Sequence, residues 1–171
     1  MKEKDYKSVV HQFKPIYNAS SRSLILGSFP SVVSRRNNFY FSNPHNRFWK
    51  VLIEGVYKEK DLSDNALRTE FILDHGLALF DVISSCDIIS SDDSSIKQIV
   101  PNNLRFIVDN SRINNVFLNG KKAYEIYLKY FQDLKIKPFL LPSTSPANAS
   151  WTYDDLVNAY RIIKDETEKD I

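Results

Sequence analysis

Four short apolar runs recur along the chain, at residues 23–26, 77–83, 115–118 and 138–141. Short apolar runs bounded by glycine, proline or polar residues are typical of buried β-strands. Between the runs, apolar residues recur three or four positions apart. This spacing predicts helices over 48–56, 63–76, 104–108, 121–131 and 156–163. Strands that alternate with helices indicate a parallel sheet covered on both faces. We therefore predict a three-layer α/β/α fold around a central four-stranded parallel sheet, in a single domain over residues 1–171.

Two local signals refine this outline. At the amino end, Val9, Val10 and Phe13 have the spacing of a short helix face. Farther along, Ser63 is expected to cap a helix that Gly76 closes, because serine favours helix starts and glycine favours helix ends.

Three polar stretches follow predicted strands, at residues 27–46, 84–96 and 142–151. Their serine, asparagine, aspartate and proline content predicts irregular loops. We expect the three loops to converge, because the carboxyl ends of parallel strands share one edge of the sheet. The first loop carries three consecutive aromatic residues at 39–41 and two arginines at 35–36. Aromatic rings stack on bases and arginines contact phosphates, so this mixture favours a nucleic-acid substrate.

The overall charge is nearly balanced. Lys and Arg total 23 against 21 Asp and Glu in 171 residues, while apolar residues make up 43% of the chain. The apolar fraction is sufficient for a core, and any surface that binds nucleic acid must be local rather than global.

Several classes of site are excluded by what the sequence lacks. Cys86 is the only cysteine, which rules out an internal disulfide, a four-cysteine zinc site and a cysteine-ligated iron–sulfur cluster. The histidines, His11, His45 and His75, are too scattered for a metal site. The four glycines form neither a dinucleotide fingerprint nor a P-loop. We expect no cofactor and no metal. Residues 1–11 do not have the pattern of a signal peptide, and no apolar run is long enough to span a membrane, so a cytoplasmic location is expected.

Four motifs together resemble the uracil-DNA glycosylase superfamily. They are GSFPS at 27–31, FYFSNPHNRFW at 39–49, GKKAY at 120–124 and LPSTSPA at 141–147. The likeness covers roughly residues 23 to 163. It is strongest to the hypoxanthine-DNA (deoxyinosine) glycosylases and the mismatch-specific uracil/thymine-DNA glycosylases. The resemblance implies a uracil-DNA glycosylase-like fold and an enzyme that flips a damaged nucleotide out of DNA and hydrolyses its N-glycosidic bond.

The resemblance also implies roles in the first loop. Gly27, Ser28 and Phe29 would line the substrate site, and Phe41 would stack on the flipped base. Many family members have Asp or Asn where this chain has Phe29. Hypoxanthine-DNA glycosylases lack that residue too and use an asparagine later in the same region. Asn46 matches it and is the expected catalytic residue. From the residues alone, the alternative for Phe41 is a core phenylalanine, and the alternative for Asn46 is a helix N-cap, a role compatible with catalysis.

The last loop and the two arginines would bind DNA. By resemblance, Ser143 and Ser145 would contact phosphates beside the flipped nucleotide, although turn formation explains both equally well. Ala147 stands where relatives insert a larger wedge, and Asn148 is a substitute for it.

Charged residues beside the first loop complete the predicted surface. Arg35 and Arg36 are expected phosphate contacts, with solvation as the alternative. Asp81, Asp92 and Asp93 are candidates to supply a carboxylate at the same rim.

These observations predict a monofunctional, monomeric DNA glycosylase of base-excision repair that acts on DNA with deaminated bases and prefers hypoxanthine. Hypoxanthine pairs poorly with thymine, which lowers the cost of flipping, and its two rings offer a larger stacking face. The alternatives are a mismatch-specific uracil/thymine-DNA glycosylase, a non-catalytic DNA-binding domain of the same fold, and a small-molecule hydrolase.

Overall fold

The computed structural model describes residues 5–169, and a four-stranded parallel sheet lies at its centre. Its order is β3-β2-β6-β7, from β2 (Ser23–Gly27), β3 (Leu77–Asp81), β6 (Asn115–Asn119) and β7 (Pro138–Leu141). The predicted central sheet is confirmed. The predicted run 77–83 is one strand only as far as Asp81, and the chain enters a second sheet at Ile83.

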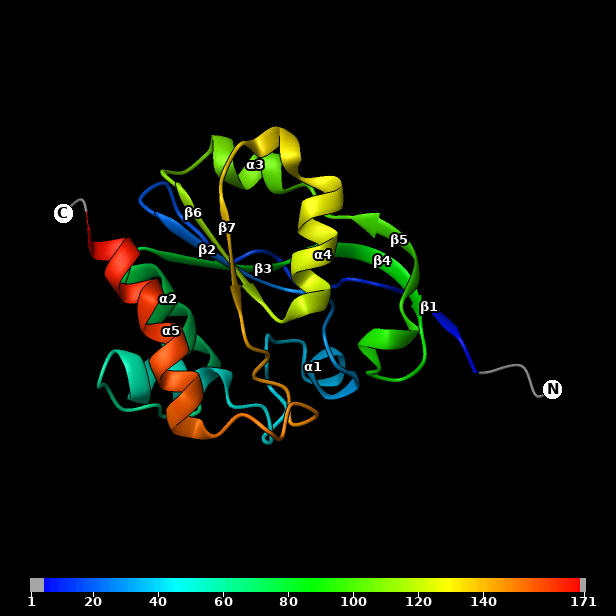
Figure 1. Cartoon of the computed structure of the whole chain (residues 1–171), viewed down its shortest axis with the longest axis horizontal. Helices are drawn as coiled ribbons and strands as arrows, with labels where there is room; N and C mark the ends of the chain where they lie inside the picture. The colour runs from blue at the N-terminus through cyan, green and yellow to red at the C-terminus, as the bar shows by residue number, and fades with distance from the viewer. Residues whose placement is uncertain (1–4, 170–171) are drawn as a thin grey trace.

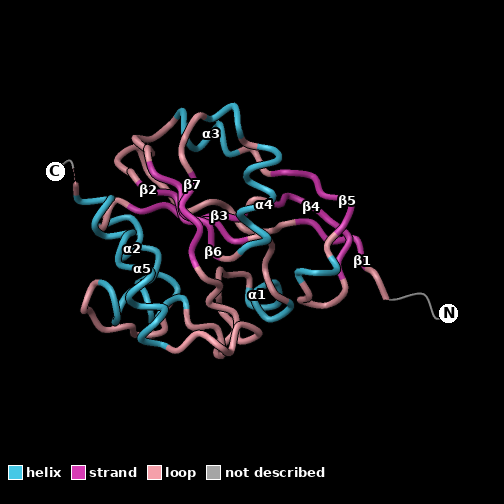
Figure 2. The backbone as a smooth tube through the Cα atoms, viewed as in Figure 1, coloured by secondary structure: helices cyan, strands magenta, loops and turns pink. Residues whose placement is uncertain are grey.

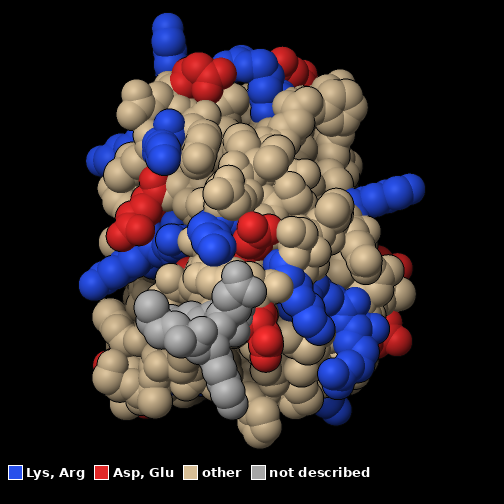
Figure 3. Space-filling view, turned by 90° about the vertical axis from the view of Figure 1, so that its right-hand side faces the viewer, with Lys and Arg blue, Asp and Glu red and all other residues tan. Residues whose placement is uncertain are grey.

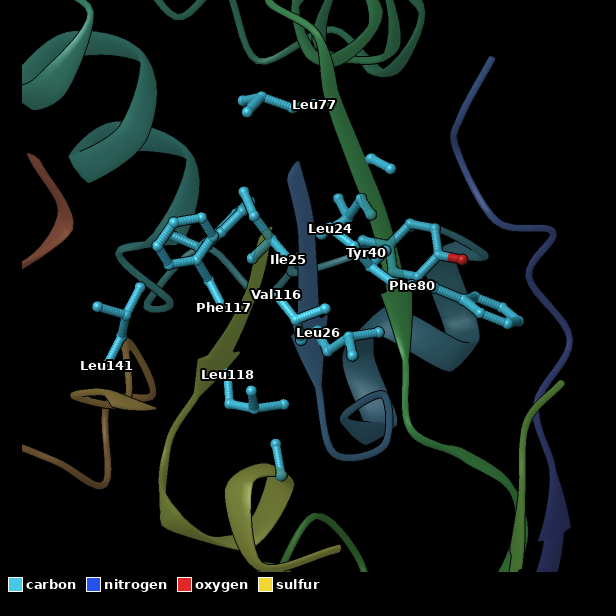
Figure 4. Packing of buried hydrophobic residues seen from close by; sticks show 14 of the residues in the cluster. Leu24, Ile25, Leu26, Tyr40, Leu77, Phe80, Val116, Phe117, Leu118 and Leu141 are labelled. Atoms are coloured by element: carbon cyan, nitrogen blue, oxygen red, sulfur yellow. The ribbon is translucent and has the colours of Figure 1, made fainter. Parts of the chain in front are cut away.

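The core is built on β2, in which all five residues are buried. Leu26 is registered with Phe80 on β3 and with Leu118 on β6, whereas Ile25 is registered with Phe117. Side chains alternate along a strand, so these residues divide between the two faces of the sheet, and Figure 4 shows them packed there.

Helices cover both faces of the sheet, as predicted (Figures 1 and 2). On one side lie α2 (Asn65–Asp74), α5 (Tyr153–Glu168) and a π-helix, η1 (Lys50–Val56). On the other lie α3 (Leu104–Asp109) and α4 (Lys121–Tyr130). Helix α5 packs on η1 at Gly55, where a Cβ atom would collide with Val157. Within residues 5–169, no helix is long and apolar enough to cross a membrane.

A second sheet corrects two sequence predictions. It is antiparallel, in the order β1-β4-β5, from β1 (Lys7–Val10), β4 (Ile83–Ile88) and β5 (Lys97–Pro101). The predicted helix face at Val9 and Val10 is therefore wrong, because that segment pairs with β4 in the register Val9 to Cys86. The predicted loop 84–96 is also wrong in its first half. Its polar residues alternate with buried ones along β4, which suits a half-exposed strand.

Smaller corrections concern helix starts. The first loop contains a short helix, α1 (Val32–Asn37), which Ser31 caps by accepting a hydrogen bond from the Ser34 amide. Asp64 caps α2, one residue after the predicted Ser63. Two 3₁₀ turns, η2 (Asp93–Ser95) and η3 (Gln132–Leu134), complete the described elements.

Candidate active site

The three loops predicted to converge are joined by hydrogen bonds at the carboxyl edge of the central sheet. Ser28 Oγ donates to Asp93 Oδ1 at 2.9 Å, and the Val32 amide donates to Ser91 Oγ at 2.8 Å. On the other side of the first loop, the Arg47 amide donates to the Thr144 carbonyl at 3.1 Å. Segments far apart in the sequence thus form one continuous rim.

Asn46 is held in the rim by a chain of hydrogen bonds. Thr144 Oγ1 donates to Asn46 Oδ1 at 2.8 Å and accepts from Asn119 Nδ2 at 2.9 Å. The Phe48 amide also donates to Asn46 Oδ1, at 2.9 Å.

Two donors on Asn46 Oδ1 fix the orientation of the amide. The Asn46 Nδ2 group has no hydrogen-bond partner among residues 5–169. Asn46 therefore has a helix-capping contact through Oδ1 and a free donor at Nδ2, so the two roles considered for it are compatible.

Phe41 is held in an unusual backbone conformation. Its φ angle is +48°, in the left-handed region that bulky residues seldom adopt. Its ring stacks on Phe48 with centroids 4.2 Å apart, and its Cζ atom lies 3.3 Å from where a Cβ on Gly27 would be. Strain of this kind costs about 1–3 kcal/mol and is concentrated at functional sites. The ring is partly buried, between the core and the rim.

Phe29 lies in an aromatic cluster. It is 8% exposed, and the Arg35 guanidinium stands over its ring at 5.6 Å from the centroid. Arg35 also donates to the carbonyls of Pro30 at 2.7 Å and Ser90 at 3.2 Å. The guanidinium therefore joins the first two loops. Arg36 is exposed.

Two carboxylates flank the turn at Gly27 and Ser28. Asp81, at the end of β3, pairs through Oδ2 with His11 Nε2 at 2.7 Å. Asp93 is exposed as a residue, but its carboxylate lies against Ser28. Desolvation there raises the pKa of Asp93, the Ser28 hydrogen bond and Lys122 oppose the shift, and the charges of Asp81 and Asp92 add to it.

The last loop is folded by its own side chains. Ser143 Oγ accepts from the Ser145 amide at 3.1 Å, and Ser145 Oγ accepts from the Ala147 amide at 3.2 Å. Asn148 Nδ2 donates to the Ser143 carbonyl at 2.9 Å. The turn contacts of both serines are present, and each hydroxyl keeps its own proton for donation. Ala147 is exposed.

Arg47 fixes this loop to the start of η1. Its guanidinium donates to the carbonyls of Trp151, Asn148 at 3.1 Å and Ser145 at 3.5 Å. The planar guanidinium suits several acceptors at once. Arg47 is thus an internal clamp of the rim.

Comparisons with known proteins agree with this geometry. A sequence model of the uracil DNA glycosylase superfamily matches residues 14–164. The chain belongs to the uracil DNA glycosylase superfamily. It is 31% identical over 141 residues to a hypoxanthine DNA glycosylase of Methanosarcina acetivorans and 28% identical over 137 residues to one of Methanosarcina barkeri. Each alignment covers 80% of this chain and 86% of the relative.

A solved structure has the same fold. The solution NMR structure of a Methanosarcina acetivorans protein described as a candidate uracil DNA glycosylase superposes with a TM-score of 0.74. The match covers 90% of this chain and 98% of the other at 24% sequence identity. The superfamily fold expected from the motifs is therefore confirmed.

Charged side chains of both signs are mixed on the surface of this superfamily member. Figure 3 shows Lys and Arg side chains in separate groups on the face that carries the small sheet, with Asp and Glu between them. This distribution agrees with the near-neutral sequence and shows no uniformly basic face in that view.

Three residues of the rim were not assigned a role from the sequence: His11, Asn119 and Thr144. Arg47 was expected to contact phosphate, whereas its guanidinium donates to three backbone carbonyls of the last loop. Thr144 and Asn119 are buried and lie 25 positions apart. Asn119 donates to Thr144, and Thr144 in turn donates to Asn46. The only sequence signals for these two residues were that Thr144 lies within the LPSTSPA motif and that Asn119 directly precedes the GKKAY motif. Within the described part of the chain, no group of three or more His, Cys, Asp or Glu could hold a metal ion.

Proposed function

We propose that this protein is a monofunctional DNA glycosylase that hydrolyses the N-glycosidic bond of deaminated bases, with hypoxanthine preferred. The observation that carries the proposal is the Asn46 amide. Its oxygen is occupied by Thr144 and Phe48, and its Nδ2 donor is unused. The nearby ring of Phe48 stacks on Phe41, whose backbone has a left-handed conformation. Two relatives that are 28% and 31% identical are named hypoxanthine DNA glycosylases, which supports the same substrate.

In this mechanism the rim binds the flipped base and orients the reacting groups. The base stacks on Phe41, in the manner of aromatic platforms that bind unpaired bases. Asn46 Nδ2 donates a hydrogen bond to a base acceptor or to the attacking water, because an amide nitrogen donates and does not act as a base. Loss of the base passes through an oxocarbenium-like sugar, with negative charge growing on the departing base. A hydrogen bond donated by Asn46 Nδ2 stabilises that negative charge and so favours departure of the base.

Water activation is weak in this arrangement, because Phe29 offers no polar group. The reaction then depends more on an easily flipped base and on stacking, both of which favour hypoxanthine. No lysine nucleophile is evident in the motifs, so the product is an intact abasic strand. We propose that the enzyme acts as a monomer in the cytoplasm, with Ser143, Ser145, Arg36, Ala147 and Asn148 along the DNA.

A panel of oligonucleotides tests this proposal. Duplexes carry hypoxanthine, uracil, xanthine or a thymine mismatch at one position, and abasic sites are scored as alkali-labile breaks with enzyme in excess. Hypoxanthine is expected to be excised fastest. Faster excision of uracil opposite every base would support the mismatch-specific alternative. Tight DNA binding with no abasic site from any base would support a non-catalytic domain.

A further inference from the structure

Trp151 is an exposed aromatic residue at the end of the last loop. It is 39% exposed, whereas Trp49, the other tryptophan of the chain, is 2% exposed and donates through Nε1 to the Tyr40 carbonyl at 2.9 Å. The indole of Trp151 has no aromatic, cationic or hydrogen-bonding partner among residues 5–169. Tryptophan is highly buried on average, so an exposed indole without a partner indicates a surface that receives a ligand.

The backbone of Trp151 is fixed on both sides. Its amide donates to the Asn148 carbonyl at 3.3 Å, and its carbonyl accepts from the Arg47 guanidinium. The next residue, Thr152, caps α5, and its Oγ1 accepts from the Asp155 amide at 3.1 Å. The indole therefore stands on a held backbone, which lowers the entropy that is lost when a ligand binds to it.

The same contacts place Trp151 at the border of the rim. Arg47, which binds its carbonyl, directly follows Asn46 in the chain. Trp151 is also the only aromatic residue of the last loop, because residues 142–150 read PSTSPANAS. It is therefore the one ring that this loop can offer to DNA bound along the rim.

The charges beside Trp151 favour a base over a phosphate as its ligand. Asp154 and Asp155 lie in the first turn of α5, and both are exposed. Two carboxylates repel a phosphate, whereas they do not repel the uncharged face of a base. Aromatic side chains bind unpaired bases by stacking, and they do so with little regard to sequence.

We propose that Trp151 stacks on an unpaired base beside the flipped nucleotide and so holds the opened DNA on the rim. This inference rests on the proposed function, because an enzyme that flips a nucleotide leaves unpaired bases next to it. The base is either the one left without a partner on the opposite strand of a duplex or a neighbour of the flipped nucleotide on its own strand. Both offer the same face to the indole. Phe41 is separate, since it lies in the first loop and is the proposed platform for the flipped base itself.

Binding to uncleavable DNA tests this role without relying on catalysis. We would measure affinities for DNA that carries 2′-fluoro-deoxyinosine, whose glycosidic bond resists cleavage. One duplex has thymine opposite the analogue, a second has a tetrahydrofuran sugar without a base there, and a third probe is the single strand. The proteins are wild type, Trp151→Phe and Trp151→Ala. Tryptophan fluorescence is recorded in the same titrations, because stacking on a base quenches an indole.

Trp151→Ala is expected to bind at least one of these DNAs about 10-fold more weakly than wild type, the typical effect of losing one base–aromatic stack. Trp151→Phe keeps a ring and should retain most of the affinity. DNA should quench wild type but not Trp151→Phe, because Trp49 is buried. A loss confined to the thymine duplex assigns the stack to the opposite base. A loss that persists opposite tetrahydrofuran assigns it to a neighbouring base, and either result supports the proposal.

The matched control is Phe106→Ala, which removes another exposed aromatic side chain, on α3. It should leave all three affinities unchanged. Thermal unfolding checks that each variant is folded. Wild-type affinity of folded Trp151→Ala for all three DNAs, or the same quenching in Trp151→Phe as in wild type, would overturn the inference. Binding that depends on Trp151, without an abasic site from any deaminated base in cleavable DNA, would instead refute the proposed function and leave the stacking role standing.

Discussion

Thr144 Oγ1 donates a hydrogen bond of 2.8 Å to Asn46 Oδ1, which ties the loop after β7 to the loop after β2. With Oδ1 engaged, the Nδ2 group of Asn46 remains without a hydrogen-bond partner among residues 5–169. In the same chain, Asn119 holds Thr144 from both sides, through Nδ2 at 2.9 Å and Oδ1 at 3.1 Å. Three side chains therefore determine where one donor points.

This chain of bonds predicts a graded effect of substitutions at Thr144. Thr144→Val keeps the shape but removes the hydroxyl, so Asn46 loses its anchor and single-turnover excision of hypoxanthine should fall by about 10-fold, the value of one lost hydrogen bond of about 1.4 kcal/mol. Thr144→Ser keeps the donor and should stay near wild type. Equal rates for Thr144→Val and Thr144→Ser, with both folded, would contradict the positioning role.

DNA affinity should fall as the salt concentration rises, and we expect Arg36 to contribute one phosphate contact to this dependence. Each phosphate contact releases counterions, so Arg36→Ala should reduce the slope of log affinity against log salt by about 1. Arg35→Ala is a less direct test, because Arg35 also donates to the Pro30 and Ser90 carbonyls. Arg105, on α3, pairs with Asp133 on η3, and α3 lies far from α1 in Figure 1. Arg105→Ala is therefore the control that should leave the slope unchanged. A wild-type affinity independent of salt would refute a phosphate-binding rim.

The raised pKa of Asp93 predicts a pH-dependent stability. Because the pKa is higher in the folded state, folding disfavours the ionised carboxylate. This cost is present above the folded pKa and is relieved as the pH falls through it. Asp93→Asn keeps an acceptor for Ser28 without the charge. It should melt at a higher temperature than wild type near neutral pH, about 7, and the difference should close as the pH falls towards the ordinary aspartate pKa of about 4. A difference that grows at low pH would show that the assigned sign is wrong.

The contact between η1 and α5 predicts a stability cost at Gly55. A Cβ at this position would collide with Val157, and overpacking of this kind typically costs about 1–3 kcal/mol. Helix propensity alone would make Gly55→Ala more stable by up to about 1 kcal/mol. A net loss of unfolding free energy in this variant therefore reports the collision with Val157. The free energy of unfolding from denaturant titration gives this loss. In a Val157→Ala background the loss should shrink, and an undiminished loss would locate its cause elsewhere.

The sequence predicted the central sheet because its strands carry local signals. Residues Ser23–Gly27 and Asn115–Asn119 are apolar runs that end at or just before glycine, and each lies where it was predicted. The second sheet could not be predicted in the same way. β1 is a four-residue strand with an exposed pattern, and it pairs with residues more than seventy positions away, so its pairing leaves no local periodicity.

The site follows the same division. The motifs located the loops, and their convergence is confirmed by contacts such as Ser28 to Asp93. The role of Thr144 depends on a hydrogen bond to Asn46, which is 98 positions away in the sequence. The left-handed conformation of Phe41 could not be predicted either, because phenylalanine rarely adopts it. Side-chain hydrogen bonds over such separations are set by the folded topology.

The most direct test of the account is the product formed from a deoxyinosine duplex by wild type and by Asn46→Ala, with enzyme in excess. Wild type should release free hypoxanthine, seen by mass spectrometry, and leave an unbroken abasic strand. Asn46→Ala should bind the duplex with similar affinity but release the base at least about 100-fold more slowly, the typical effect of losing a group that acts in the transition state. Release at the wild-type rate by folded Asn46→Ala, or no free base from wild type, would contradict the account.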